Sequence, residues 1–415
     1  MAAATRLSRR TLLKYGAFGV MAATGSALPA FGAPLSGCLR GVSTNLSATM
    51  VTSHVVTLDI ATGQIEYTPL PGQRAGHSLI PLPSGGYYAV SYGDHEAPCL
   101  FLDRDMTLVG ELRADNGYGF GGHAVVLPDN RHVLGHFNRN QLEAGAGTEN
   151  FGDLFVVDIA TRKVIHRQKN DVIHAHDIIV SRDRKTAIVS DDGTLDGLDL
   201  QVVLASDDPF QLPVISPSLK IYDVASFALV KTIPLPINGS VVHIEQGFDG
   251  AVFGGVEQFV ATNPTGLAAL RAVLGDDAGR YIKQLGGDTG DKVIPFPGPV
   301  VRVDLATSNV EQDINALNQD PFDMKYNPHT GYMLSIFTTS DRLARFNSRN
   351  AKWDYFDTLQ YGIKEPFGMV DLTGTPLVAI NGFDKGIAII DVTTMTLVKH
   401  FDTQNLGTKH LLYEA

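Results

Sequence analysis

Cysteine is almost absent from this chain, which contains only Cys38 and Cys99 in 415 residues. At most one disulfide can form, so the fold does not depend on a disulfide framework. The sequence also has no CxxC pair, no CxxCH haem-attachment site, no GxxxxGKS/T phosphate loop and no GxSxG elbow. These absences argue against thiol-redox, covalent-haem, P-loop nucleotide and serine-hydrolase chemistry.

Positive charge is scarce as well. Lys and Arg total 33 against 44 Asp and Glu, which gives a net charge of −11 at pH 7. Nucleic acids and anionic lipid surfaces bind basic patches, so neither is expected as a partner. The segment GYGFGG (117–122) is similar to a dinucleotide-binding fingerprint, but no helix of a βαβ unit follows it. We interpret this segment as a turn that leads into a strand.

A short motif occurs seven times along the chain. Each copy has an apolar strand, an acidic or amide residue, a tight turn and a second strand; the copies span 55–65, 99–109, 154–164, 219–229, 300–310, 342–352 and 387–397. The polar residue ends the first strand and is expected to accept backbone N–H groups in the turn. It falls at Asp59, Asp103, Asp158, Asp223, Asp304, Asn347 and Asp391. Repeated units of this size bury their faces against one another, so the sequence predicts an all-β, seven-bladed β-propeller.

A second set of hairpins lies between these copies. Six of them pair two strands across a polar turn, at 76–90, 122–135, 175–189, 242–254, 322–334 and 367–379. A seventh first strand occurs only at the C-terminus, KHLLYEA (409–415), and GVSTNLSATMV (41–51) can supply its partner. Pairing of the C-terminal strand with this N-terminal strand would close the ring and leave no exposed sheet edge. We therefore expect a single propeller domain over residues 38–415.

Aligning the first strands of these hairpins brings histidines together. Five of the 13 histidines in the chain fall at one aligned position, and the other two blades have Asp323 and Gly368 there. The histidines are His77, His123, His176, His243 and His410. The innermost strands of a propeller line its central channel, so these side chains should converge near one mouth. Five imidazoles and a carboxylate are suited to a transition metal. The alternative is that each histidine is structural and bonds to the backbone of a neighbouring blade.

Further polar residues are predicted at the same mouth. His174 and His176 form an HxH pair, and alternation along a strand sends both side chains to one face. The ends of the second strands add secondary candidates, which are His95, His136, Asp191 and Glu257. Long insertions leave from those strand ends, at 138–152, 192–217 and 258–297, and are expected to cover the mouth. The last of them contains a predicted helical segment at 263–285.

The N-terminus carries a predicted twin-arginine export signal. SRRTLLK (8–14) precedes a weakly apolar stretch at 15–31, and residues 30–32 are similar to a small-residue cleavage site. We expect residues 1–32 to be removed, the folded protein to be periplasmic, and the mature chain to have no transmembrane span. LSGC (35–38) is also similar to a lipobox, which would place a lipid anchor on Cys38. Whether Cys38 is lipidated or paired with Cys99 is left open.

The strands that carry three of these histidines also resemble a known family. GHAVVLPD, HAHDIIVSRD and VVHIEQGFDGAVFGGVEQ, in this order, are similar to strands of twin-arginine-exported bacterial propellers known only as a domain of unknown function. The resemblance covers roughly residues 54–400 and matches the family's histidines at His123, His176 and His243. Members are often encoded beside imelysin-like, iron-regulated envelope proteins, which implies a role near iron acquisition. The chain departs from the family at HAHD, where Ala and Asp replace the usual Pro and Glu.

Three classes of function follow from these observations. The first is a periplasmic protein that binds or handles a transition metal, with iron favoured and zinc or copper next. The second is a metal-dependent enzyme, an oxidoreductase or lyase, that uses the same histidines; this rests on analogy of fold alone. The third is a protein-interaction platform with structural histidines. The expected partners are a metal ion or small molecule in the central funnel and an envelope protein.

Overall fold

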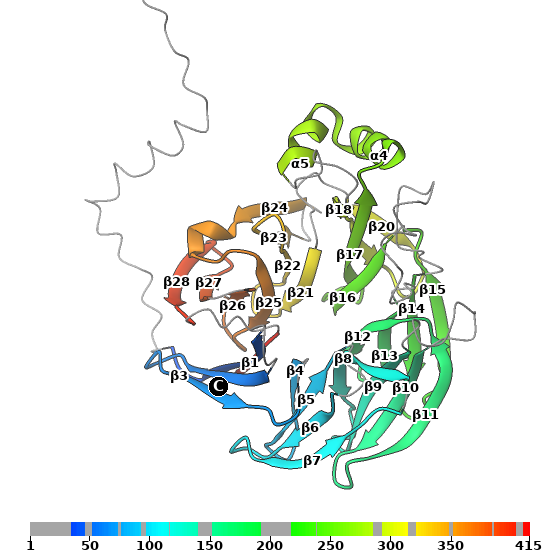
Figure 1. The fold of residues 1–415 in the computed structure, drawn as a ribbon, viewed down its shortest axis with the longest axis vertical. Helices are drawn as coiled ribbons and strands as arrows, with labels where there is room; N and C mark the ends of the chain where they lie inside the picture. Colours follow the sequence, from blue (N-terminus) through cyan, green and yellow to red (C-terminus); the bar gives the residue numbers. More distant parts are fainter. Residues whose placement is uncertain are drawn as a thin grey trace, which may run out of the picture. The chain divides into compact units, whose positions relative to one another are not determined.

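The structure is a computed structural model. It describes residues 35–45, 52–73, 76–92, 97–115, 117–139, 152–191, 217–237, 239–284, 293–313, 321–347, 352–383, 386–403 and 410–415. The chain divides into two compact units, Met1–Ser36 and Gly37–Ala415. The second unit consists of seven antiparallel sheets arranged around a central axis, with β4, β8, β12, β16, β21 and β25 nearest the centre (Figure 1).

Each sheet is one propeller blade of four main strands. Blade 1 contains β29 (Leu411–Glu414), β1 (Cys38–Asn45), β2 (Thr52–Asp59) and β3 (Ile65–Pro69); blade 2 contains β4 (Gly76–Pro81), β5 (Tyr87–Ser91), β6 (Cys99–Leu102) and β7 (Leu108–Leu112); blade 3 contains β8 (Tyr118–Val126), β9 (His132–Arg139), β10 (Gly152–Asp158) and β11 (Lys163–Val172). Blade 4 contains β12 (Ala175–Val180), β13 (Thr186–Asp191), β14 (Ser218–Asp223) and β15 (Leu229–Pro234); blade 5 contains β16 (Ser240–Gln246), β17 (Val252–Ala261), β19 (Val300–Val303) and β20 (Val310–Asp313). Blade 6 contains β21 (Pro321–Asn327), β22 (Tyr332–Phe337), β23 (Arg342–Asn347) and β24 (Lys352–Asp357); blade 7 contains β25 (Pro366–Asp371), β26 (Leu377–Gly382), β27 (Ile387–Asp391) and β28 (Thr396–Phe401). The seven-bladed propeller predicted from the sequence is confirmed.

The ring closes in blade 1, which contains strands from both ends of the propeller. In the antiparallel pair of β1 and β29, Leu39 lies opposite Tyr413. Glu414 adds side-chain contacts, because it forms an ion pair with Arg40 and its Oε1 accepts a hydrogen bond of 2.5 Å from Tyr87 of blade 2. The predicted pairing of the two ends is confirmed; the partner strand begins at residue 38 rather than 41, and residues 46–51 of the predicted strand lie outside the described residues.

The outer hairpins contain the predicted polar turn residues. Asp59 Oδ1 accepts a hydrogen bond from the Thr62 amide, and Asp158 Oδ1 accepts one from the Thr161 amide, both at 2.7 Å. Equivalent bonds are made by Asp103, Asp223, Asp304 and Asp391. The turn bonds hold the pKa of Asp59 and Asp158 below the ordinary value of an aspartate. Asn347 ends β23, and its side chain lies outside the described part of the structure.

The hydrophobic core lies between neighbouring blades. One cluster joins Ile188 of blade 4 to Val241 of blade 5, and another joins Leu334 of blade 6 to Val378 of blade 7. All four side chains are fully buried. Burying a side chain of this size stabilises a fold by about 1.5–3 kcal/mol. The packing of the blades therefore rests on apolar contacts away from the axis.

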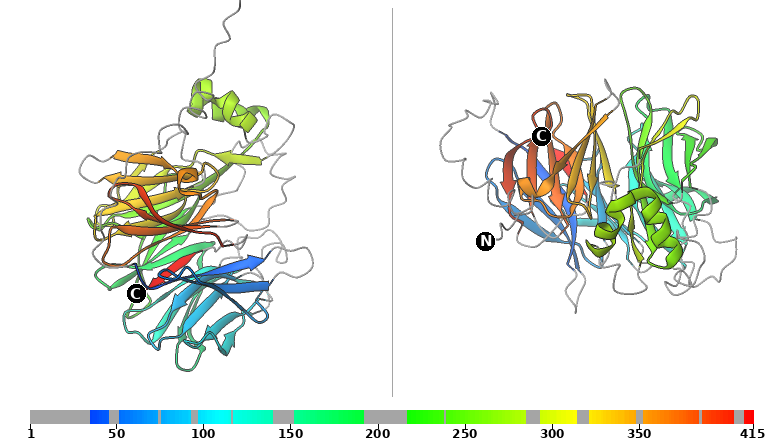
Figure 2. Two further views of the ribbon diagram at one scale, coloured as in Figure 1. Left: turned by 90° about the vertical axis from the view of Figure 1, so that its left-hand side faces the viewer. Right: turned by 90° about the horizontal axis from the view of Figure 1, so that it is seen from above.

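The insertion in blade 5 contains the predicted helical segment. It forms α4 (Pro264–Leu274), the 3₁₀ turn η1 (Gly275–Asp277) and α5 (Ala278–Gln284), and β18 (Val293–Phe296) then pairs with the extension of β17. Asn263 caps α4, because its Oδ1 accepts from the Gly266 amide at 2.8 Å. Leu270 and Tyr281 bury against Phe296, so the insertion has its own small core. The helices lie outside the ring of blades (Figure 2). The other two predicted insertions, 138–152 and 192–217, lie outside the described residues except at their ends.

Both cysteines are free thiols in this structure. Cys99 in β6 is fully buried, and burial raises the pKa of its thiol to about 12.

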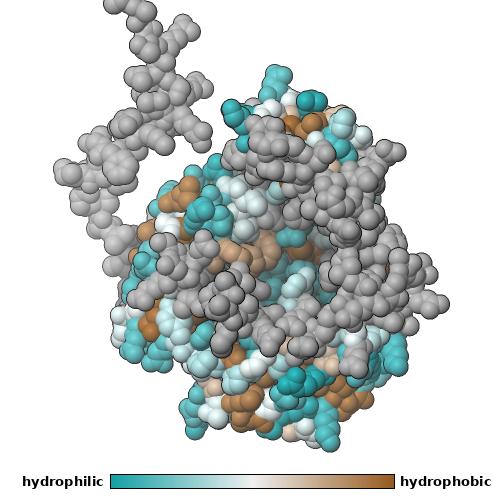
Figure 3. Space-filling model, in the orientation of Figure 1, coloured by the Kyte–Doolittle hydropathy of each residue, from teal (hydrophilic) through white to brown (hydrophobic). Residues whose placement is uncertain are grey.

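Among the described residues, no helix is long and apolar enough to cross a membrane. A second 3₁₀ turn, η2 (Thr358–Tyr361), follows β24. On the face seen in Figure 3, hydrophilic residues and smaller apolar patches are intermixed.

Candidate metal centre

The histidines near the axis come from two adjacent rows of the innermost strands. Cross-strand pairing defines the rows: Pro81 lies opposite Tyr87, which lies opposite Leu102, the residue before the turn residue Asp103. Pairing in the other six blades identifies one residue equivalent to Pro81 in each innermost strand or, in blade 1, in β29. The first row consists of the residues three positions before these reference residues: Ser78, His123, Asp177, His243, Asp323, Gly368 and His410. The second row consists of the residues four positions before the same reference residues: His77, Gly122, His176, Val242, Phe322 and Phe367. Sequence alignment predicted one common position, whereas the structure places His77 and His176 one residue earlier than the other three.

Irregular pairing lets both rows contribute to one cluster. The register of β4 against β5 shifts around His77, and that of β12 against β13 shifts around residues 176–177. Blades 3 and 5 have shifts at residues 121–123 and 242–243. An extra residue in one strand re-aims the neighbouring side chains, which is a known use of β-bulges at functional sites. The bulges explain how histidines one residue apart in register point to the same centre.

Two glycines in β8 make room for this arrangement. Gly122 has a φ of +88°, and a Cβ atom there would lie 2.7 Å from the His77 ring. A Cβ atom on Gly121 would lie 1.7 Å from the His136 ring. Both residues belong to the GYGFGG segment, which was predicted to be a turn before the strand; all of it except Gly117 is instead part of strand β8 itself. Glycine is required here because two imidazoles approach the backbone closely.

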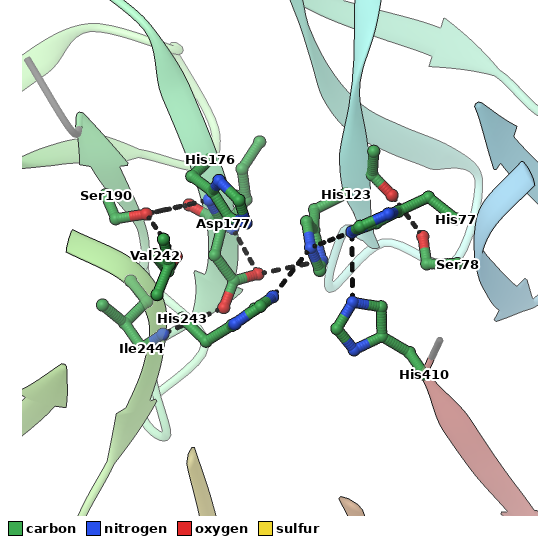
Figure 4. Close-up of polar contacts among 12 residues, drawn as sticks. His77, Ser78, His123, His176, Asp177, Ser190, Val242, His243, Ile244 and His410 are labelled. Carbon is green, nitrogen blue, oxygen red and sulfur yellow. Dashed lines mark hydrogen bonds and ion pairs between the residues drawn. The ribbon is translucent and has the colours of Figure 1, made fainter. Parts of the chain in front are cut away.

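Four imidazoles form a compact, buried group. One ligand atom from each of His77, His123, His176 and His243 lies within 4.8 Å of the others, and the four residues are 2–9% exposed. His123 Nε2 lies 3.0 Å from His77 Nε2 and 3.1 Å from His243 Nε2 (Figure 4). Two imidazole nitrogens on one ion at about 2.0–2.1 Å lie roughly 3–4 Å apart, so these separations suit a shared coordination sphere.

The second nitrogens of two rings fix the direction of their lone pairs. His243 Nδ1 donates to the Phe322 carbonyl oxygen, which can only accept. His123 Nδ1 lies 3.4 Å from Asp177 Oδ1, so a proton on this nitrogen faces a carboxylate. In their neutral forms both rings then present an Nε2 lone pair, and these lone pairs face each other across 3.1 Å. Two facing lone pairs repel unless a proton or a metal ion lies between them.

His176 favours a metal ion over a proton at this position. Its Nε2 is buried and has no hydrogen-bond partner among the residues that the structure describes. Burial, followed by the nearby histidines, holds the pKa of His176 well below the ordinary value of histidine. A neutral, buried imidazole nitrogen of this kind is a good ligand for zinc, copper, iron or nickel. The donor set therefore fits a transition metal.

A second layer of polar residues holds β12 in place behind the group. His136 Nε2 donates to the His176 carbonyl oxygen at 3.1 Å, and Asn138 Nδ2 donates to the Ala175 carbonyl oxygen at 3.0 Å. Burial lowers the pKa of His136 to about 4, so this imidazole is neutral at physiological pH. His174 does not join the four-histidine group, and its Nε2 lies 3.0 Å from Asn138 Nδ2 instead. Metal-ligating strands are commonly held by outer contacts of this type.

The remaining predicted residues have other positions. Asp191 is fully buried and binds the amides of Ile173 and His174 and the ammonium group of Lys220. Glu257 lies in β17 opposite Ser240 and is not part of the group. His95 lies outside the described residues. None of these three joins the four-histidine group in the part of the chain that the structure describes.

Asp323 and His410 lie at the edge of the group. Both are outside the set of four, but His410 Nε2 lies 3.1 Å from His77 Nε2. The Asp323 carboxylate accepts backbone amides from Met324 and Met369, at 2.8 and 2.9 Å. Burial raises its pKa above the ordinary value of an aspartate. Asp323 therefore contacts the backbone and is not placed as a direct ligand.

Blades 6 and 7 present phenyl rings where blades 2 and 4 present imidazoles. Phe322 and Phe367 occupy the second row, with ring centroids 4.1 Å apart, and Phe322 lies 4.8 Å from the His243 ring. Phe367 also contacts Phe383, which is 41% exposed. Sequence reasoning missed this aromatic wall because the alignment selected the residues one position later, Asp323 and Gly368. It missed Asp177 as well, although HAHD contains it.

Fold and site together define a seven-bladed β-propeller with a buried four-histidine group that could hold a metal ion. No family model and no curated protein matches the chain. Similar solved structures include hydrazine synthase of Kuenenia stuttgartiensis, with 12% identity, a TM-score of 0.54 and coverage of 88% of this chain and 95% of that one. Others are the computationally designed Ika8 protein (10%, 0.51, 92% and 93%) and streptogramin B lyase (13%, 0.51, 84% and 91%). At these identities the similarity concerns the fold alone.

Proposed function

We propose that this protein is an exported, periplasmic propeller that binds a transition metal through its axial histidines. The observation that carries the proposal is the opposition of the His123 and His243 lone pairs beside the buried Nε2 of His176. When both imidazoles are neutral, their two Nε2 lone pairs repel each other, and a cation bound between them removes this repulsion. Metal binding also explains why apolar interblade packing coexists with a polar group at the axis.

Export and iron are the finer parts of the proposal. The SRRTLLK motif supports twin-arginine export, and export in a folded state lets a protein take its metal in the cytoplasm. The resemblance to propellers encoded near iron-regulated proteins favours iron, with zinc and copper next. A role in metal acquisition or handling beside an envelope protein follows from the same resemblance. A lipid on Cys38 would tether the protein to the membrane surface.

The test measures metal in protein exported by its own pathway. Wild-type protein is purified from the periplasm without chelator, under anaerobic conditions, and analysed for iron, zinc, copper and nickel by mass spectrometry. We expect about one ion per chain. His123→Ala combined with His176→Ala should remove it and leave the circular dichroism spectrum unchanged, because neither side chain belongs to the apolar clusters that pack the blades. The control is His166→Ala, which removes an exposed histidine of β11.

Two outcomes decide the proposal. Wild-type protein that carries no metal, and that takes up none of the four ions after purification, contradicts it and leaves the histidines structural. Metal retained by the double variant places the site elsewhere in the chain. Cytoplasmic retention after Arg9→Lys with Arg10→Lys tests export separately, since the receptor reads the guanidinium pair.

A metal-dependent enzyme is the second candidate, and the aromatic wall favours it. Phe322 and Phe367 flank the group from blades 6 and 7, which supply no imidazole, as a site for an apolar substrate would require. Catalytic centres keep a coordination position open, whereas structural centres do not. Cobalt-loaded protein titrated with azide distinguishes the two: a changed visible spectrum indicates an open position, and an unchanged one contradicts the enzyme.

A further inference from the structure

The same aspartate arrangement occurs twice around the axis. Asp177 in blade 4 and Asp323 in blade 6 occupy the first row of their blades. Each carboxylate accepts the amide of the next residue, Ile178 or Met324, in both cases at 2.8 Å. Each also accepts an amide of the following blade: Ile244 at 3.0 Å for Asp177, and Met369 at 2.9 Å for Asp323. The two aspartates are therefore structural equivalents that link adjacent blades.

Each aspartate also faces the Nδ1 atom of an axial histidine. Asp177 Oδ1 lies 3.4 Å from His123 Nδ1, and Asp323 Oδ2 lies 4.0 Å from His410 Nδ1. Negative charge near Nδ1 favours a proton on that nitrogen and leaves Nε2 as the ligating atom; at 4.0 Å the Asp323 carboxylate acts on His410 through its charge rather than through a direct hydrogen bond. His123 belongs to the four-histidine group and His410 does not. The two histidines therefore share a nearby carboxylate but not the same blade relation, because His123 comes from the blade before Asp177 and His410 comes from blade 1, two blades beyond Asp323.

The position of His410 completes the comparison. Its Nε2 lies 3.1 Å from His77 Nε2, and its ring centroid lies 4.7 Å from that of His123 and 4.8 Å from that of His243. Phe322 stacks beside it at 6.3 Å with an interplanar angle of 10°. We infer that His410 is a fifth metal ligand, oriented by Asp323, and that the metal thereby fastens the closing strand β29 to blades 2 to 5. This inference rests on the proposed metal-binding function.

The consequence is a coupling between metal binding and ring closure. β29 has four residues and pairs only with β1 among the described strands, so its sheet contacts are few. A ligand directly before this strand would add a link, through the metal, to blades 2 to 5. Because coupling free energies are reciprocal, metal should stabilise the closed ring and closure should raise the affinity for metal. The other four histidines lie within β4, β8, β12 and β16, each of which pairs with the next strand along the chain, whereas β29 pairs with the sequence-distant β1.

The experiment measures hydrogen exchange of the backbone amides in 411–414 with and without zinc, after chelator treatment. Wild-type protein, His410→Ala and the control His166→Ala are compared. Zinc should slow exchange of these amides about tenfold or more in wild type and control, since local opening then requires loss of a ligand. In His410→Ala, zinc should still bind, about tenfold more weakly, and change the exchange rate less than about twofold. Asp323→Asn, which keeps the fold but weakens the orientation of His410, should fall between.

The outcomes separate the two levels of the proposal. No zinc binding by wild type contradicts the proposed function and this inference with it. Zinc binding by wild type without slower exchange in 411–414 overturns the inference and leaves the four-histidine site standing. Equal protection in His410→Ala also overturns it. If His410→Ala is not soluble, His410→Gln replaces it, because glutamine keeps a polar group at this position without an imidazole nitrogen.

Discussion

Blades 2 to 5 and blades 6 and 7 have the same backbone and opposite chemistry at the axis. The first group supplies His77, His123, His176 and His243, and the second supplies Phe322 and Phe367 from the row that also carries His77 and His176. All seven sheets have four main antiparallel strands, and apolar clusters of the same kind join blade 4 to blade 5 and blade 6 to blade 7. The comparison shows that the repeat determines position, while one side chain in each innermost strand determines chemistry. A metal centre can therefore be one-sided within a nearly symmetric fold.

Removing residues 408–415 should have the largest effect, because it breaks blade 1, which lies between the histidine-bearing blades 2 to 5 and the phenylalanine-bearing blades 6 and 7. The deletion removes β29 and leaves β1 without its inner neighbour. The inner edge of β1 is then exposed, which promotes aggregation. We expect insoluble or protease-sensitive protein, measured by the soluble fraction and by limited trypsin digestion. A melting curve equal to that of wild type would contradict the closure.

Gly122→Ala should displace the His77 ring in the four-histidine group while the propeller still folds. The added Cβ would meet the His77 ring at 2.7 Å, at a φ of +88°. We expect a loss of about 1–3 kcal/mol in free energy of unfolding and a clear loss of metal affinity. Gly250→Ala is the matched control, because its φ is +83° and no atom lies within 4 Å of the added Cβ. Equal metal affinities in the two variants would show that crowding of His77 is unimportant.

Phe322→His tests whether blade 6 can also supply a ligand, because it places an imidazole where this blade has a phenyl ring. Phe322 lies in the same row as His77, and its ring is 4.8 Å from that of His243. An additional ligand at this distance should raise zinc affinity about tenfold, the size of effect seen for single residues around metal sites. Isothermal titration calorimetry compares it with Phe322→Leu, which removes the ring without adding a donor. Equal affinity in both variants would show that blade 6 lies too far from the ion.

The smallest effect is expected far from the axis, at the outer turns, where both groups of blades are alike. Turn hydrogen bonds lower the pKa of Asp59, Asp158, Asp223 and Asp304 in the folded protein. A lowered folded pKa contributes stability above the unfolded pKa, and this stability is lost as pH falls through the folded pKa. Wild-type protein should therefore lose stability below about pH 4 more steeply than Asp223→Asn. Parallel curves in urea titrations would contradict this role.

The fold was predictable from the sequence because its signals are local. An Asp that ends a strand and binds the amides three or four residues on, as at Asp59, repeats in nearly every blade and gives the count directly. The convergence of the histidines was predictable for the same reason. The β-bulges were not, because an extra residue such as His77 leaves no mark in a single sequence. The alignment therefore placed His77 and His176 level with His123 and His243, whereas the structure puts them one residue earlier, in the row of Phe322 and Phe367.

The histidine group also has a bearing on the order of events during synthesis and folding. His77 and His410 meet although 333 residues separate them along the chain, and every histidine of the group comes from a different blade. Contacts of such high sequence separation form late, since a long loop must close before they can be made. A nascent or truncated chain has parts of the donor set but never the whole. Only chains whose last residues have been synthesised and folded would then bind metal with full affinity. Metal occupancy would therefore distinguish completely folded chains from incomplete ones.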